Sequence, residues 1–318
     1  MILILGAAIG VALLAGAAFH LNSARSSYNR YVDLALFENG VKINLIGASS
    51  FSRNQEAGVI EVGIDADSSE ESKSFVRSAY GFLASLSGRT LNVTDATANL
   101  FGQSRSVYVA SPSRSLQNGV DDFVQKLRNS AQQTFPNERA GEFWAYLSST
   151  VGKFNGAPFF FNSEFAGIDF DNVIKNAAQH RLANTKIEHS VVYVNTPFLE
   201  GRSASENQMF TNYVALQEIF QDYNLASDVN DPEFKLKTIL YDHDEALGNL
   251  TGAQRRDELR KNAATGLCLF DVMLTKQLGQ NAGNAPAPVG IIAFLSLQVS
   301  AYYHRWSGDD DLFDRRCW

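Results

Sequence analysis

Residues 1–19 read MILILGAAIGVALLAGAAF, and this uncharged run decides how the rest of the chain is interpreted. Nine of its 19 residues are Ile, Leu, Val or Phe. As an α-helix the run is about 28 Å long, close to the ~30 Å hydrocarbon thickness of a bilayer. We therefore predict a single transmembrane helix at residues 1–21, followed by a juxtamembrane segment at 22–40. The alternatives are a buried soluble helix and a cleaved signal peptide, which normally begins with basic residues.

Small residues recur at helical spacing within this run. Gly6 and Gly10 form one pair four residues apart, and Ala12 and Gly16 form another. Small side chains allow a second helix to approach closely inside a membrane. We predict that this face packs against other membrane-protein subunits and that the remaining surface contacts the lipid bilayer. Chance occurrence in a segment rich in Ala and Gly is the alternative.

Charge and cysteine content bear on the compartment of the body. Arg25 and Arg30 follow the apolar run, and basic residues stay on the cytoplasmic side of a membrane. This predicts a body on the cytoplasmic or equivalent interior side, with the opposite orientation left open. Cys268 and Cys317 are too few to form a disulfide framework for a long chain. Free thiols in a reducing compartment are therefore favoured over a single bridge.

The composition is that of a folded body and argues against a nucleic-acid partner. The 318 residues are 45% hydrophobic and include 22 Phe, enough apolar material for a sizeable core. The formal net charge is −7, and the chain has no basic stripe that would attract phosphate groups.

Short runs of alternating apolar residues predict strands, and runs with a spacing of three and four predict helices. Asp67 to Glu70 is typical of a helix start. Strands are predicted around residues 41–45, 60–64, 107–109 and 191–194, the first two as a hairpin; helices are predicted around 75–86, 120–127, 143–154, 209–223, 234–247 and 259–278.

These patterns predict an α+β fold dominated by helices, with a small sheet in the first half of the body. We expect an α+β domain at residues 41–155 and a mainly helical domain at 170–318. The apolar run at 289–303 is short for a membrane span, so a buried core helix is favoured over a second span.

Residues 155–170, NGAPFFFNSEFAGIDF, are rich in Phe and contain Gly and Pro. They predict an irregular connector between the two domains. Its aromatic residues form either a docking surface or a loop that packs on the core. The residues concerned are Phe159, Phe160, Phe161 and Phe165.

Motifs for catalysis, cofactors and metals are absent from the sequence. It contains no phosphate-binding glycine loop, no GxSxG, no HExxH and no CxxC. Asp65 to Glu70 resembles a calcium loop but has Glu70 where such a loop needs Gly. We therefore expect no cofactor and no metal, and no catalytic residue is assigned.

The sequence thus favours a non-enzymatic structural or accessory subunit of a larger membrane-bound assembly. Two alternatives are a membrane-tethered hydrolase, for which Asp242 and His243 are the first residues to consider, and a tethered module that binds a ligand or peptide.

Overall fold

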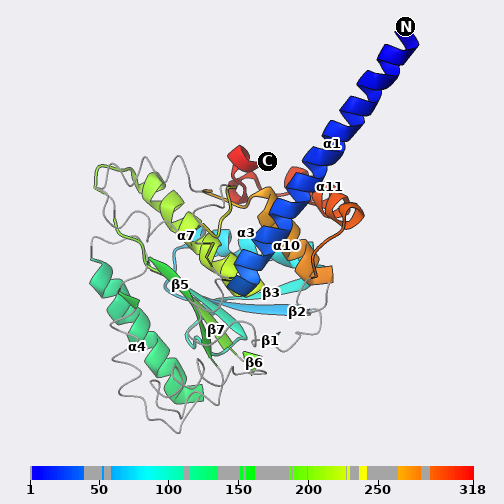
Figure 1. The fold of residues 1–318 in the computed structure, drawn as a ribbon. Helices are drawn as coiled ribbons and strands as arrows, with labels where there is room; N and C mark the ends of the chain where they lie inside the picture. The colour runs from blue at the N-terminus through cyan, green and yellow to red at the C-terminus, as the bar shows by residue number, and fades with distance from the viewer. Residues whose placement is uncertain are drawn as a thin grey trace.

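The structure is a computed structural model of the chain (Figure 1). Within the described residues, the side chains at 2–15, 37–38, 52–53, 96, 132, 134, 160–161 and 186–187 lie outside the description. The described residues are 2–38, 52–53, 59–110, 115–134, 151–152, 155–161, 186–187, 189–198, 200–226, 228–229, 236–241, 264–280 and 287–318.

A five-stranded sheet with the order β3-β2-β4-β7-β5 forms the centre of the body. The first four strands in this order pair in parallel, and β5 pairs antiparallel to β7 at one edge. Two further short strands, β1 and β6, pair with each other. The bounds are β1 Ser52–Arg53, β2 Val59–Asp65, β3 Thr90–Thr97, β4 Arg105–Val109, β5 Gly156–Phe161, β6 Lys186–Ile187 and β7 His189–Val194.

Helices cover both faces of this sheet. After β2 the chain passes through α3 (Glu70–Ser87) to β3, at one edge of the sheet. After β4 it passes through α4 (Leu116–Thr134) and later reaches β7, on the side of the other edge. Right-handed crossovers in opposite directions place their helices on opposite faces. α7 (Ala204–Asn224) packs with α3 on the face opposite α4 (Figure 1).

Alternate strand residues divide the core between the two faces, because successive side chains point to opposite sides of a strand. Val107 and Val192 belong to the larger hydrophobic cluster with α3 and α7. Tyr108 and Tyr193 belong to a second cluster, in which the Phe123 ring of α4 lies 4.5 Å from the Tyr193 ring.

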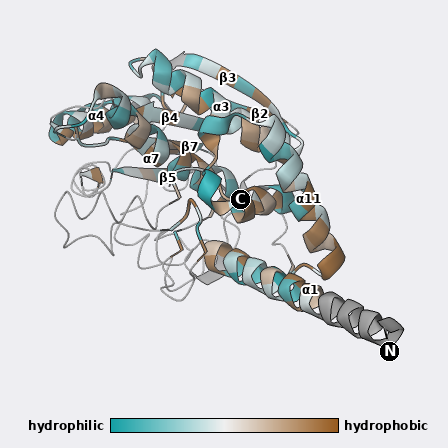
Figure 2. Cartoon of the chain, turned by 90° about the horizontal axis from the view of Figure 1, so that it is seen from above, coloured by the Kyte–Doolittle hydropathy of each residue, from teal (hydrophilic) through white to brown (hydrophobic). Residues whose placement is uncertain are grey.

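A third group of helices packs beyond α3. It comprises α1 (Ile2–Asp33), which continues as a π-helical turn at Leu34–Glu38, α10 (Leu269–Gln280) and α11 (Ile291–Ser307). Two 3-10 turns, Asp310–Leu312 and Arg315–Cys317, end the chain. α1 extends away from the body, and α11 crosses it where it leaves (Figures 1 and 2).

The predicted fold class is confirmed in part: helices dominate and a sheet is present, but six described α-helices and a mixed, mostly parallel sheet make the fold α/β and not α+β. The strands predicted at 60–64, 107–109 and 191–194 are confirmed, but the sheet is not confined to the first half of the chain. The predicted hairpin partner at 41–45 lies outside the described residues. The division at residues 155–170 stays a prediction, although one sheet takes β4 and β7 from either side of it.

The helices predicted at 75–86, 120–127 and 209–223 are confirmed as α3, α4 and α7. α3 begins where the sequence predicted, because the Ser69 hydroxyl accepts a hydrogen bond from the Ser72 amide at 3.1 Å. Only Leu269 and the residues after it are helical in the run predicted at 259–278, among the residues that are described. The helix predicted at 143–154 lies mostly outside the description.

The predicted irregular connector was wrong for Gly156–Phe161, which form β5. Pro158 has no amide hydrogen to donate and suits an edge strand, which is the position of β5. The helix predicted at 234–247 is also wrong over residues 236–241, which form turns and a bridge. There the Ile239 and Leu240 amides bond to the side chains of Asp271 and Thr238 in place of helix carbonyls.

Among the described residues, no helix is both long enough and apolar enough to span a bilayer. Most of the run at 1–19 has its side chains outside this description. The membrane span at 1–21 therefore stays a prediction.

We predict that Gly279→Ala destabilises the body by about 1–3 kcal/mol, because overpacking forces backbone shifts. A Cβ atom at Gly279 would lie 2.5 Å from the Ser87 Cα atom, where α10 meets the end of α3. Urea unfolding followed by circular dichroism measures the change.

Gly81→Ala is the matched control within α3. Its added Cβ would approach the Leu91 side chain only to 3.8 Å, and Ala is favoured over Gly in a helix by up to ~1 kcal/mol. Equal stability losses in the two variants would contradict the close approach of α10.

Candidate functional site

The C-terminal part of α1 is inserted into the body. Tyr28 and Tyr31 are fully buried, whereas Ala17 to His20, three turns earlier, are exposed. The Tyr28 ring lies 5.2 Å from the Phe270 ring of α10 and 6.0 Å from the Phe294 ring of α11. α1 is therefore held between these two helices by aromatic packing.

Polar contacts fix the same part of α1 in rotation and depth. The Tyr28 hydroxyl donates to Gln277 Oε1 at 2.7 Å. Asn29 Oδ1 accepts from the Val289 amide at 2.9 Å, and Arg25 Nη1 donates to the Val289 carbonyl at 3.4 Å. Since these partners lie on α10 and just before α11, α1 contacts both helices at defined residues.

Asp271, in the first turn of α10, is fully buried and collects hydrogen bonds from three segments. The hydroxyls of Tyr31 and Thr238 each donate to Oδ1 at 2.6 Å. The amides of Ile239 and Cys268 donate to Oδ2 at 3.0 and 2.7 Å. Burial raises the pKa of the Asp271 carboxyl, against the opposite effect of these donors.

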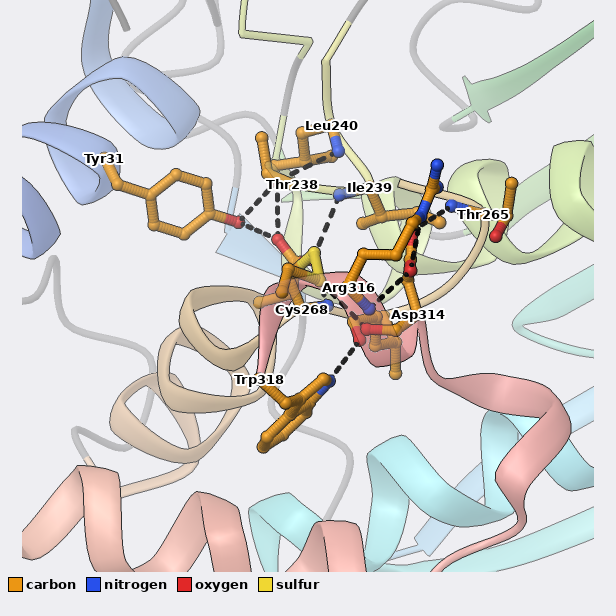
Figure 3. The surroundings of a disulfide bond; sticks show 12 residues. Tyr31, Thr238, Ile239, Leu240, Thr265, Cys268, Asp314, Arg316 and Trp318 are labelled. Atoms are coloured by element: carbon orange, nitrogen blue, oxygen red, sulfur yellow. Dashed lines mark hydrogen bonds and ion pairs between the residues drawn. A yellow bond between two sulfur atoms is a disulfide. The ribbon is translucent and has the colours of Figure 1, made fainter. Parts of the chain in front are cut away.

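The C-terminus is bound to the turn that precedes α10 (Figure 3). Cys268 and Cys317 form a disulfide, and the Trp318 indole donates to the Leu267 carbonyl at 3.0 Å. The Asp314 carboxylate accepts from the Thr265 amide at 2.9 Å and pairs with Arg316. Burial opposes ionisation of Asp314, but its hydrogen bonds from Arg316 and Thr265 leave its pKa below the usual value.

The favoured prediction of two free thiols was therefore wrong, and the single bridge that was the alternative is present. Sequence reasoning missed it because Cys268 and Cys317 are separated by 49 positions, and only the return of the chain after α11 brings them together.

The predicted helix-packing residues are only partly described. The Gly16 position is open, with no atom within 4 Å of an added Cβ. The side chains of the other three, Gly6, Gly10 and Ala12, lie outside the description. Nothing in the described body covers the Gly16 face of α1.

The predicted aromatic docking residues are likewise only partly described. The half-buried Phe159 ring lies 5.9 Å from the Phe123 ring and packs on the second hydrophobic cluster. Phe165 lies outside the description, as do Asp242 and His243.

The carboxyl edge of the sheet is the usual location for ligands in a doubly wound fold, at the point where strand order reverses. Here the reversal lies between β2 and β4. Ser68 occupies this point: its hydroxyl donates to the Val109 carbonyl at 3.2 Å and lies 3.4 Å from the Val109 amide. The Ser68 side chain thus links the segment after β2 to the end of β4.

An ion-pair cluster lies at the same edge. Lys126 of α4 contacts Asp65 at 2.8 Å, Asp67 at 2.7 Å and Asp122 at 3.4 Å, and its ammonium lies over the Tyr108 ring. Burial alone would lower the pKa of Lys126, but the carboxylates raise it. Lys126 thus ties α4 to the buried Asp65 at the end of β2 and to the exposed Asp67 beyond it. No His, Cys, Asp and Glu group within the described ranges is arranged to hold a metal ion.

A second buried ion pair lies at the opposite, amino edge of the sheet. Arg105 Nε lies 3.4 Å from Asp222 Oδ2, and the Tyr80 hydroxyl donates to the same oxygen at 2.9 Å. Arg105 also lies over the Tyr223 ring. These contacts join β4, α3 and α7, which is a structural role.

We predict that Tyr31→Phe loosens α1, because it removes one donor from the buried Asp271. The expected loss is about 1–2 kcal/mol of unfolding free energy. Hydrogen exchange should rise first at residues 22–33, the part of α1 that Tyr31 holds.

Tyr28→Phe is the matched control, since it removes a bond to the neutral Gln277 and should cost less, about 0.5–1.5 kcal/mol. Unchanged exchange in α1 of Tyr31→Phe would show that Asp271 does not hold this helix.

We also predict that the double variant Cys268→Ser, Cys317→Ser unfolds more easily by about 4 kcal/mol, the loop-entropy value for a bridge across 49 positions. Denaturant unfolding of the variant should match that of the reduced native chain. Alkylation of both thiols in the unreduced, unfolded native chain would contradict the bridge.

Comparisons with known proteins place this chain in no family. No protein-family model, no curated protein and no solved structure matches it.

Proposed function

We propose that the chain is a membrane-anchored, non-enzymatic subunit of a larger assembly, held in the bilayer by the N-terminal part of α1. The observation that carries this proposal is the change in burial along one helix. Tyr31 is fully buried in the body, whereas Phe19, twelve residues earlier, is 72% exposed. The sequence that precedes Phe19 is uncharged and apolar, so a medium other than water suits it.

The attachment of α1 to the body supports an anchor over a loose tail. Its final turns are fixed by aromatic packing and by bonds from Arg25, Tyr28, Asn29 and Tyr31. Towards its N-terminus, α1 extends away from the body (Figure 1).

The disulfide supports a body in an oxidising compartment. Bridges between cysteines persist outside the cytoplasm and are rare inside it. We therefore propose the extracytoplasmic orientation, which reverses the prediction from Arg25 and Arg30. Two arginines are a weak signal of membrane topology. The Cys268–Cys317 bridge is a covalent bond that joins the turn before α10 to the C-terminus.

A subunit role is supported by the small residues of the apolar run, since polar groups at the switch point of the sheet bond to one another. There Ser68 bonds to Val109, and Lys126 pairs with Asp65 and Asp67. The small residues Gly6, Gly10, Ala12 and Gly16 offer a face for a partner helix in the membrane.

We predict that the native chain remains with the membrane fraction after a carbonate wash and co-purifies with a partner in mild detergent. The double variant Gly6→Leu, Gly10→Leu should stay in the membrane, because it gains apolar surface, but should lose the partner. Native mass spectrometry and blue-native electrophoresis measure the association.

Ala18→Leu is the matched control, since residue 18 lies about 80° or more around the helix from each of the four small residues. It should retain both the membrane and the partner. A native chain that washes off the membrane would overturn the anchor, and one that purifies alone would overturn the subunit role.

A further inference from the structure

α11 is apolar on two opposite faces. The inner face packs into the body through Phe294, Leu297 and Ala301, all at most 4% exposed. The outer face also carries large apolar side chains, and these are exposed. The favoured prediction of a buried core helix for residues 289–303 is therefore correct for the inner face alone. The outer residues are Ile292, Leu295, Val299, Tyr302, Tyr303 and Trp306.

These outer residues form a continuous stripe, because their spacing of three and four places them on one side of a helix. Its most exposed members are Ile292 at 85%, Val299 at 70% and Trp306 at 91%. On a folded protein, a contiguous exposed apolar patch of this kind marks an interaction surface. We call these six residues the outer stripe.

The outer stripe is continuous with the exit of α1. Arg25 of α1 and the first turn of α11, including Ile291 and Ile292, line one open groove. Val289, immediately before α11, is held by Asn29 and Arg25. The hydrophobic first turn of α11 lies beside α1, and α11 then crosses the direction in which α1 leaves the body (Figure 2).

The surroundings of the stripe favour lipid over a second helix. A helix pair in water usually has charged residues flanking its apolar seam. Residues 291–303 contain no Asp, Glu, Lys or Arg. Tyr302, Tyr303 and Trp306 gather at the C-terminal end, and such amphipathic rings favour the boundary between hydrocarbon and headgroups.

We propose that α11 lies in the plane of the membrane surface, with its outer stripe inserted among the lipid headgroups and upper acyl chains. This inference rests on the proposed anchoring through α1, which would bring α11 to the bilayer. α11 then acts as an interfacial helix whose inner face belongs to the body and whose outer face binds lipid.

Trp306 provides the test within the full-length chain. The chain is reconstituted into phosphatidylcholine vesicles with or without brominated acyl chains, which quench only tryptophans that reach the acyl region. We expect brominated lipid to quench the native chain more than Trp306→Phe, and aqueous iodide to quench the two about equally. Trp318→Phe is the matched control and should keep most of the bromine effect, because the half-buried Trp318 indole donates to the Leu267 carbonyl and its ring packs on Tyr302 at the edge of the stripe.

Each outcome separates the two proposals. A chain that fails to float with the vesicles overturns the anchor and the placement of α11 together. A floating chain in which iodide quenches Trp306 and bromine does not overturns only the placement of α11. A floating chain in which neither quencher reaches Trp306, with twice the monomer mass in detergent, shows that a second copy covers the stripe.

Discussion

The buried carboxylate of Asp271 is the constraint on which this architecture depends. A carboxylate without partners is costly to bury, so its donors must all be in place when the body folds. They come from α1, from the segment at 238–239 and from the turn before α10. The disulfide begins in that same turn, so a covalent bond and a buried polar network hold the same short piece of chain. The contacts that hold α1 and the disulfide that holds the C-terminus thus belong to one structural unit around the turn before α10.

The two helices that carry the proposed membrane contacts, α1 and α11, both pack against α10 of this unit. At the carboxyl edge of the sheet, where doubly wound folds often bind ligands, Ser68 bonds to Val109 and Lys126 pairs with Asp65. Large exposed apolar side chains lie on the helices beyond α3, at Phe19 of α1 and in the outer stripe of α11. The two helices contact each other although about 270 residues separate Phe19 from the start of α11. A surface made by both ends of the chain is available only after the whole body has folded.

Local patterns in the sequence predicted individual elements well and their assembly poorly. Alternation at Ile60, Val62 and Ile64 identified β2, and the cap at Ser69 identified the start of α3. The polar run TLNVTDAT gave no strand signal, since β3 is an edge strand with one exposed side, and its pairing with β2 decides that the sheet is parallel. The buried network around Asp271 could be predicted from the sequence even less well than the fold. Tyr31, Asp271 and Thr238 are distant in sequence, and a lone Asp among apolar residues of α10 was the only hint.

The uninterrupted course of α1 has a mechanical consequence. From Ile2 to Asp33 the backbone forms a single helix, without the loop that usually separates an anchor from its domain. A flexible tether would let the body swivel and sample many aspects of its surroundings. Because α1 is continuous and is bonded to the body at residues 25–31, a tilt of its N-terminal end also tilts the body. The orientation of the first turns of α1 therefore determines the orientation of the whole body relative to whatever binds those turns.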